Sequence, residues 1–393
     1  MSAVGTSGLQ RRRGGAGANG SASPAAGPST PTGSGPGGAS ASAAAAVASG
    51  ALGKAALTGD HRIAYDPRDL DDPQETRAHP RLTLMDECLL LGLKDRQGYL
   101  SFWNDNISYT LRGCILIELA LRRRIGVSRD GAARARPLSE RPLELLDSRM
   151  TGEVLLDETL RLIKGAEPMG AAQWVDLLSG ETWNVTKIGF QLKQVRERLA
   201  KGLVDKGVLR TEKRNFLLFD MATHPVADSG AKDAVLRRVL TLLTSRSGTL
   251  PSPGSLYRDE GKAVSAPATR SLALLCCAFS ANVLENALTH LAYDAREAAF
   301  QKADDLLADF AQWPMAPRSG AAIGSNVAGP AGGARKPGIG EGSMSTEAQG
   351  AGVSTAELAK AVRAELVRGD AGEAQFETIA AVLHVLSRMD SLL

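Results

Sequence analysis

The stretch "LRGCILIELALRRRIGV" spans residues 111–127, and it is apolar at every position from Cys114 to Leu121 except Glu118. An apolar run this continuous is typical of a helix that is buried on all of its faces. The arginines at 122–124 follow the run, where positive charge complements the negative end of a helix dipole. The sequence therefore predicts a buried helix with a basic C-terminal end.

Helical periodicity is also present on both sides of this stretch. Thr83 and Asp86 have the spacing of a loose capping box, and they begin a helix that is expected to end near Gly98. In "KIGFQLKQVRERLAKGLVDKGVL", apolar residues recur at steps of three and four from Ile188 to Leu203, which predicts another helix. Further helices are expected in "TGEVLLDETLRLIKG", in "AAQWVDLLSGETW", at 228–245, at 267–310 in two pieces, and at 354–390 with a break near Gly369.

Strand signals are few. The segment "VLRTEKRNFLLFDMA" (208–222) has two apolar runs separated by the polar residues "TEKRN", which predicts a β-hairpin with Lys213 and Arg214 at its tip. The segment "YLSFW" (99–103) reads as an extended stretch, and residues 128–150 read as a polar loop with one short strand. The predicted class is therefore mainly α, with one conspicuous hairpin.

Two low-complexity segments divide the chain. Residues 1–60 are mostly Gly, Ala, Ser, Pro and Thr, and so little apolar surface cannot offset an ordering cost of roughly 1 to 2 kcal/mol per residue. A similar stretch occupies 319–350. We therefore expect a disordered arm at 1–79, a helical domain at 80–314, a disordered insertion at 315–352, and C-terminal helices at 353–393 that complete the domain.

The bulk composition names no partner. The net charge of +3 and the pI of about 8.7 describe a mildly basic protein, so an anion-binding surface would have to come from local clustering. The chain has no run of 18 apolar residues and no signal-peptide core, so we expect any membrane contact to be made from the cytosol. The four cysteines lie in apolar helical patterns without a CxxC pair, which predicts reduced core thiols: Cys88, Cys114, Cys276 and Cys277.

Patterns that carry catalysis are not found. The near-match to a phosphate loop, "GALGKA" at 50–55, lies in low-complexity sequence, and no GxSxG elbow occurs. We expect no enzymatic activity, no cofactor and no metal site. The histidines are isolated from one another and have no metal-ligand spacing: His61, His79, His224, His290 and His384.

Several basic residues could form an anion site. Lys193 and Arg196 are spaced i and i+3 on the predicted helix, where two cations could address one phosphate or could form an ordinary solvated surface. Arg112 opens the buried helix, where backbone N–H groups also favour an anion. Trp103 stands beside the polar run "NDN", and an amphipathic ring of this kind suits a membrane headgroup boundary.

The sequence of the predicted hairpin helps to distinguish between two functional classes. Its run "FLLF" must expose alternate side chains if only one face is packed, which favours a lipid or protein partner over a strand buried on both faces. A helix followed by a basic hairpin fits a winged-helix nucleic-acid-binding protein or a peripheral membrane protein. A wing that contacts DNA has little use for four apolar residues, so the membrane class is favoured: Phe216, Leu217, Leu218 and Phe219.

Long strings of this sequence resemble the Golgi phosphoprotein 3 family, over roughly residues 81–300. They are "LTLMDECLLLGLKDRQGYLSFWND", "LRGCILIELALR", "TGEVLLDETL", "DLLSGETWN", "QVRERLAKGLVDKGVLRTEKRNFLLFDMATHP" and "NVLENAL". The resemblance implies a single helical domain around a central helix bundle, with one protruding hydrophobic β-hairpin and no enzymatic activity.

The resemblance also implies a function and its residues. Members of the family are adaptors on the cytosolic face of the trans Golgi, with a cytosolic pool, that bind phosphatidylinositol 4-phosphate. The implied headgroup-binding residues are Trp103, Arg112, Lys193 and Arg196. Lys193 keeps the positive charge found there but cannot bind phosphate in the bidentate way that an Arg can. The hairpin, Glu212 to Thr223, is implicated in membrane insertion and self-association.

The implied protein partners are the COPI coat and the cytosolic tails of glycosyltransferases, which the adaptor retains or sorts. A homo-oligomer is possible, and no nucleic acid is expected. A basic cluster near the N-terminus is associated with coat binding, and the matching residues here are Arg11, Arg12 and Arg13. Three adjacent arginines on a disordered arm suit an acidic protein surface, but they would also serve as a nonspecific membrane tether.

Overall fold

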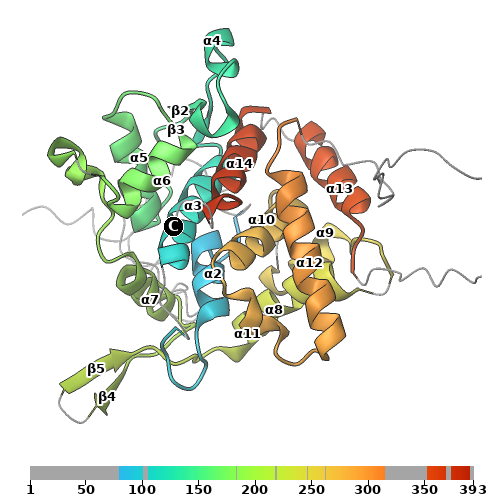
Figure 1. The fold of residues 1–393 in the computed structure, drawn as a ribbon. Helices are drawn as coiled ribbons and strands as arrows, with labels where there is room; N and C mark the ends of the chain where they lie inside the picture. The colour runs from blue at the N-terminus through green and yellow to red at the C-terminus, as the bar shows by residue number, and fades with distance from the viewer. Residues whose placement is uncertain are drawn as a thin grey trace, which may run out of the picture. The chain divides into compact units, whose positions relative to one another are not determined.

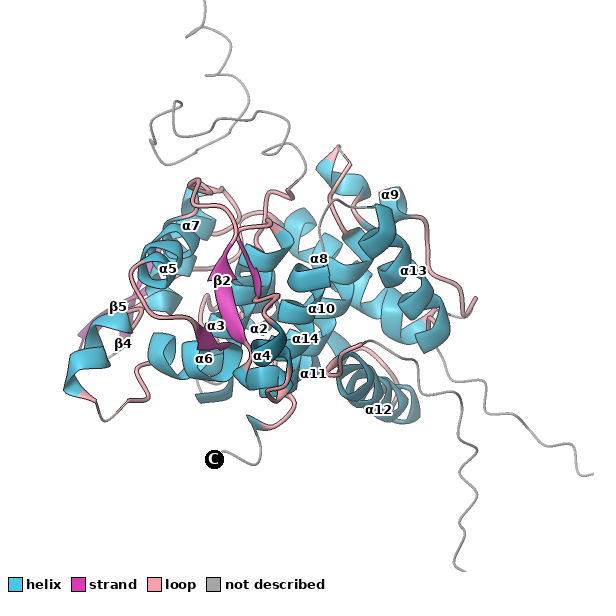
Figure 2. Ribbon diagram, turned by 90° about the horizontal axis from the view of Figure 1, so that it is seen from above, coloured by secondary structure: helices cyan, strands magenta, loops and turns pink. Residues whose placement is uncertain are grey.

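The computed structural model describes residues 79–100, 105–182, 184–216, 219–245, 247–261, 263–314, 352–368 and 373–389. All of them lie in one compact unit, Gly59–Leu393. Helices make up most of the described chain, so the mainly α class is confirmed (Figures 1 and 2). The predicted domain boundaries stay predictions.

The helices follow one another in the order that the figure labels give. The longer helices are α2 (Leu84–Gly92), α3 (Asp105–Leu121), α5 (Val154–Lys164), α6 (Ala171–Ser179), α7 (Val195–Asp205), α8 (Ser229–Thr244), α10 (Pro267–Ser280), α12 (Tyr293–Phe310), α13 (Thr355–Arg368) and α14 (Glu373–Leu386). The shorter pieces are α4 (Gly131–Arg134), α9 (Pro253–Leu256), α11 (Leu284–Leu288), and the 3₁₀ helices η2 (Leu138–Glu140), η3 (Val185–Phe190) and η4 (Arg258–Glu260).

Helix α3 is the buried helix predicted from the apolar run in residues 111–127. It contacts α2, α5, α6, α10 and α14, and these helices cover nearly its whole length (Figure 1). The apolar residues from Cys114 to Leu121 are all less than 9% exposed, which explains why this segment is apolar on every face. The predicted basic end lies just outside the helix, since α3 ends at Leu121 and Arg123 has the left-handed φ of 59°.

The one charged residue inside that run joins three helices. Glu118 Oε2 accepts from Arg270 Nη1 of α10 at 2.9 Å and from the backbone N–H of Leu84, the first residue of α2, at 3.1 Å. Arg122 Nε donates to the other carboxylate oxygen at 2.8 Å. Burial alone would raise the pKa of Glu118, but Arg270 and Arg122 outweigh it and hold the pKa well below its usual range. Glu118 is therefore buried as a charged group.

Helix α2 begins as predicted and ends earlier. Thr83 and Asp86 form a complete capping box, with each side chain bonded to the backbone of the other. The helix ends at Gly92 rather than near Gly98, because Leu93 is extended and forms a β-bridge with Leu100. The turn between Leu93 and Leu100 accepts hydrogen bonds from the residues that follow strand β5 (Phe219–Thr223).

A small sheet lies beside the end of α3. Strands β1 (Ile125–Val127), β2 (Pro142–Leu145) and β3 (Met169–Gly170) pair antiparallel in the order β1-β2-β3. Strand β2 matches the one short strand expected in 128–150. Strands β1 and β3 were missed because runs of two or three residues carry no readable alternation.

Strands β4 (Glu212–Phe216) and β5 (Phe219–Thr223) pair antiparallel and extend away from the helices (Figure 1). The predicted position of the turn is wrong. The polar residues "EKRN" form β4 itself, with Lys213 opposite Ala222 and Arg214 opposite Met221. The final pair is Phe216 with Phe219, so Lys213 and Arg214 lie along the strand and not at the tip.

The remaining expectations for the core are mostly met. The four cysteines are free and buried. The region 267–310 holds three helices instead of two, and the break near Gly369 separates α13 from α14, which packs closely on α3. Within the described ranges, no helix combines the length and the apolar character that a bilayer span requires.

Replacing Glu118 with Ala should lower the free energy of unfolding by about 3 to 5 kcal/mol, because Arg270 and Arg122 would stay buried without their counter-ion. Chemical denaturation measures the change. The control is Glu373→Ala, since that carboxylate lies 3.6 Å from Arg134 in an exposed pair and should cost less than about 1 kcal/mol. Equal losses in the two variants would contradict the role of Glu118.

Candidate functional site

Arg112 is the least expected feature of the predicted site. It lies well inside α3, whose first residue is Asp105, so the prediction that it opens the helix is wrong. Its side chain leaves the flank of α3 and is only 6% exposed. Nε donates to the carbonyl of Leu178 at 3.3 Å and Nη2 donates to the carbonyl of Leu192 at 3.0 Å. Nη1 donates to the backbone and side-chain oxygens of Ser108 at 3.1 and 2.9 Å.

All of these acceptors are neutral, and within the described residues Arg112 forms no ion pair with a carboxylate. Burial lowers the pKa of Arg112 to about 10, with no neighbouring charge to offset it. The other buried arginines all have carboxylate partners: Arg270 and Arg122 bind Glu118, Arg238 binds Glu87, and Arg124 binds Asp147. An uncompensated buried charge is costly, so Arg112 is unusual among the described buried arginines.

The main chain that Arg112 holds runs from the end of α6 to the start of α7. Helix α6 ends at Gly180, whose φ of 90° places the chain in the left-handed region. This left-handed φ favours glycine, and a Cβ at Gly180 would also displace the side chain of Gln191, whose Nε2 would lie 2.2 Å away. The N–H of Leu192 then donates to the carbonyl of Leu178 at 3.0 Å, which closes the loop back onto α6.

Lys193 and Arg196 lie at the start of α7 and are exposed. The prediction that both belong to one long helix is wrong, because α7 begins only at Val195 and Gln194 has the left-handed φ of 52°. Lys193 is therefore a loop residue that directly follows Leu192, one of the carbonyl partners of Arg112. The predicted apolar stripe is also wrong at its first position, since Ile188 lies in η3 and is 47% exposed.

The first turn of α7 carries one basic and one acidic side chain, Arg196 and Glu197. Gln194 provides no side-chain cap, so the helix dipole is not neutralised at that residue. Arg196 contacts Glu197 through Nε at 3.0 Å and Nη2 at 2.6 Å. Burial alone would raise the pKa of Glu197, but the hydrogen bond from Arg196 lowers it below its usual value. Glu197 therefore stays charged. Lys193 and Arg196 thus lie three residues apart at the start of α7, and Arg112 of α3 binds the carbonyl of Leu192, the residue just before Lys193.

Helix α7 is fastened to the rest of the protein at its far end. Lys206 Nζ lies 2.6 Å from Asp86 of α2 and 2.8 Å from Glu153, ahead of α5. Arg198 also pairs with Glu158 of α5. The helix start is consequently presented on a rigid support.

The hairpin base lies near this helix start. The N–H of His224 donates to the carbonyl of Gly98 at 2.8 Å, and the N–H of Val226 donates to the carbonyl of Asp95 at 2.9 Å. Burial lowers the pKa of His224, while the charge of Glu197 in the first turn of α7 acts in the opposite direction. Hydrogen bonds thus join the turn at 93–100 to the base of the hairpin, and His224 there lies within electrostatic range of Glu197 in α7.

Several predicted residues lie outside the described ones: Trp103, Leu217, Leu218, Arg11, Arg12 and Arg13. Phe216 and Phe219 are placed by their backbone pairing. The carbonyls of Leu178 and Leu192 were not predicted, because a backbone acceptor leaves no signal in the identity of its residue.

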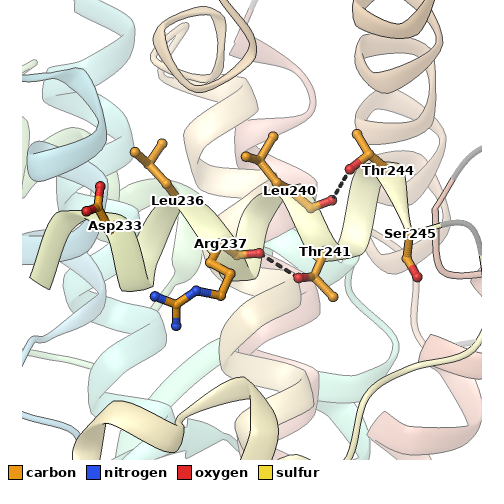
Figure 3. A pocket seen from close by; sticks show the side chains of 7 residues that line it. All are labelled: Asp233, Leu236, Arg237, Leu240, Thr241, Thr244 and Ser245. Atoms are coloured by element: carbon orange, nitrogen blue, oxygen red, sulfur yellow. Dashed lines mark hydrogen bonds between the residues drawn. The ribbon is translucent and has the colours of Figure 1, made fainter. Parts of the chain in front are cut away.

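A groove on α8 is separate from this region. It has a volume of about 490 Å³, and Figure 3 shows Leu236 and Leu240 projecting from one side of α8 and Arg237 from another. None of its lining residues belongs to α3, α6 or α7. The described residues contain no cluster of three or more His, Cys, Asp and Glu side chains that could hold a metal ion.

Comparison with known proteins gives a consistent result. Residues 84–331 match the model of the family described as Golgi phosphoprotein 3 (GPP34). The chain is 54% identical over 268 residues to vacuolar protein sorting-associated protein 74 of Schizosaccharomyces pombe, a match that covers 68% of this chain and 78% of the relative. It is 47% identical over 333 residues to the protein of the same name from Eremothecium gossypii, covering 85% and 90%.

Gln194→Val should lower the free energy of unfolding by about 1 to 2 kcal/mol, because a β-branched residue is strained at positive φ. Gln194→Gly should leave it unchanged or raise it by up to about 1 kcal/mol. Thermal and chemical unfolding of the two variants measure the difference. If Val and Gly at this position gave the same stability, the left-handed turn that places Lys193 would be ruled out.

Proposed function

Because the chain belongs to the Golgi phosphoprotein 3 family, whose members here are named for vacuolar protein sorting, we propose that it is a peripheral Golgi adaptor that binds phosphatidylinositol 4-phosphate. It would act without catalysis from the cytosolic face of the trans Golgi. Its tasks would be to bind glycosyltransferase tails and to link them to COPI vesicles.

One observation carries the lipid-binding part of the proposal, namely the buried guanidinium of Arg112 with neutral partners only. A phosphorylated headgroup would bring the missing negative charge to this region. Lys193 and Arg196 would contact the phosphate directly from the start of α7, where the helix dipole adds to their charge. Arg112 would act from beneath them through its field and by holding the Leu192 carbonyl.

The headgroup contacts would be supplemented by apolar groups. A single Lys or Arg contributes on the order of 1 kcal/mol at an anionic membrane surface, so two exposed cations give only weak attraction. Trp103 and the hairpin residues Phe216 to Phe219 would add insertion into the bilayer, or self-association through the hairpin. Docking would thus need both sets together.

The nucleic-acid alternative has less support. In a winged-helix protein, the helix before the wing lies in a DNA groove and presents cations along one face. Here the two cations lie at the start of α7, and Lys193 is outside the helix. The acidic residues Glu197 and Asp205 lie on the same helix. The vesicle-binding assay therefore includes duplex DNA as a competitor for the protein.

Lys193→Ala and Arg196→Ala should each weaken binding to phosphatidylcholine vesicles that contain phosphatidylinositol 4-phosphate by about five-fold, since each removes about 1 kcal/mol of attraction. Sedimentation with and without the phosphoinositide measures this loss. Lys201→Ala is the matched control, because Lys201 is an exposed cation of the same helix outside the proposed site. Equal binding by all three variants, or full competition by DNA, would refute the proposed site.

Replacing Arg11, Arg12 and Arg13 together with Ala should reduce recovery of the COPI coat in a pull-down several-fold, because three positive charges on one arm are removed. The same variant should sediment with the phosphoinositide vesicles as the wild type does, which controls for loss of membrane binding. Undiminished coat recovery would exclude the cluster as the coat ligand.

A further inference from the structure

The loop between α6 and α7 carries two apolar side chains into solvent. Val185 is 78% exposed and Ile188 is 47% exposed, and both belong to the 3₁₀ helix η3. A 3₁₀ helix has about three residues per turn, so side chains at i and i+3 are eclipsed. Val185 and Ile188 therefore stand in one line and form a single apolar edge.

This edge is built into a well-fastened loop. The side-chain oxygen of Asn184 accepts from the N–H of Thr186 at 3.0 Å and from its hydroxyl at 2.6 Å, which caps the start of η3. At the other end, the ring of Phe190 packs edge-on against the buried Trp174 of α6, with 5.9 Å between ring centroids. The two aliphatic side chains are thus held outward by the structure rather than left there by a loose loop.

Basic residues accompany the edge along the chain. Lys187 lies between the two apolar residues in the same 3₁₀ helix, and Lys193 and Arg196 follow along the chain. In Figure 1, the chain between α6 and α7 lies on the left of the drawing, and β4 and β5 extend from the lower end of that same side. An apolar edge among cations is the pattern of a segment that lies in an anionic membrane interface.

We propose that Val185 and Ile188 form an apolar anchor that enters the headgroup region of an anionic bilayer beside the bound phosphoinositide. This inference rests on the proposed lipid-binding function and adds a second apolar contact to the hairpin. A bilayer suits the edge better than a second copy of the chain does. Two aliphatic side chains cover far less than the roughly 800 Å² per partner of a stable protein interface, whereas a membrane accepts small apolar groups singly.

The double variant V185S/I188S should bind phosphatidylcholine vesicles containing phosphatidylinositol 4-phosphate about ten-fold more weakly than the wild type. Removing two partly inserted aliphatic side chains lowers the binding affinity by about this factor. Val367→Ser is the matched control, since Val367 is 81% exposed on α13, away from the proposed site. Thermal unfolding of all variants should match the wild type, since the altered residues are exposed.

A dye placed on the edge reports insertion directly. The four native cysteines are buried, so an added surface cysteine can be labelled selectively. Ile188→Cys carrying an environment-sensitive fluorophore should show a blue shift when the phosphoinositide vesicles are added. Gly189→Cys is the control, because Gly189 is exposed in the same 3₁₀ helix but faces another side, a side chain there meets nothing within 4 Å, and its label should shift much less.

The outcomes separate the inference from the proposed function. If the wild-type protein does not sediment with the vesicles, the proposed function fails and the anchor fails with it. If the wild type sediments but V185S/I188S binds as well as Val367→Ser and the label at 188 does not shift, only the anchor is overturned. A shift at 188 that appears without vesicles and grows with protein concentration would overturn it in favour of a contact between copies of the chain.

Discussion

The buried carboxylate of Glu118 joins the central helices of the structure. Glu118 stands in the middle of the most apolar stretch of the chain and binds Arg270 of α10, Arg122, and the first N–H of α2. A charge in this position is tolerable only because each oxygen has a charged or N–H partner. The same contacts join α3 to α2 through the Leu84 N–H and to α10 through Arg270. His79, whose pKa burial and the nearby Arg122 lower to about 2, adds no further charge to this cluster.

Helix α3 links this core to the proposed lipid site. Arg112 lies less than two turns before Glu118 on the same helix, yet its guanidinium has carbonyl and hydroxyl partners in place of a carboxylate. The other buried arginines each have a carboxylate partner, whereas Arg112 has no counter-ion within the described residues. Anchoring α3 through Glu118 also fixes the side from which Arg112 reaches Leu178 and Leu192. The core ion pairs and the candidate site are therefore parts of one arrangement.

Sequence patterns predicted the elements that depend on local residues. The capping box at Thr83, the glycine that ends α6 and the apolar run of α3 are each visible in a few adjacent positions. The start of α7 was missed because Ile188 and Leu192 keep helical spacing, although Ile188 lies in the 3₁₀ helix η3 and the left-handed Gln194 separates both residues from α7. A spacing of three or four residues does not distinguish the two kinds of helix.

The proposed site could be predicted only in part, for a related reason. The cations at 193 and 196 are visible in the sequence, but the surroundings of Arg112 are made by main-chain carbonyls of residues far away in the chain. What the fold contributes is rigidity: Lys206 fastens α7 to α2, and the packing of Phe190 on Trp174 fastens η3 to α6. Weak contacts with a membrane add up efficiently only when the groups that make them are already in place, because the entropy of ordering them is then lost in folding and not in binding. A surface of cations and small apolar groups, each worth about 1 kcal/mol, can therefore act as one binding unit on this scaffold.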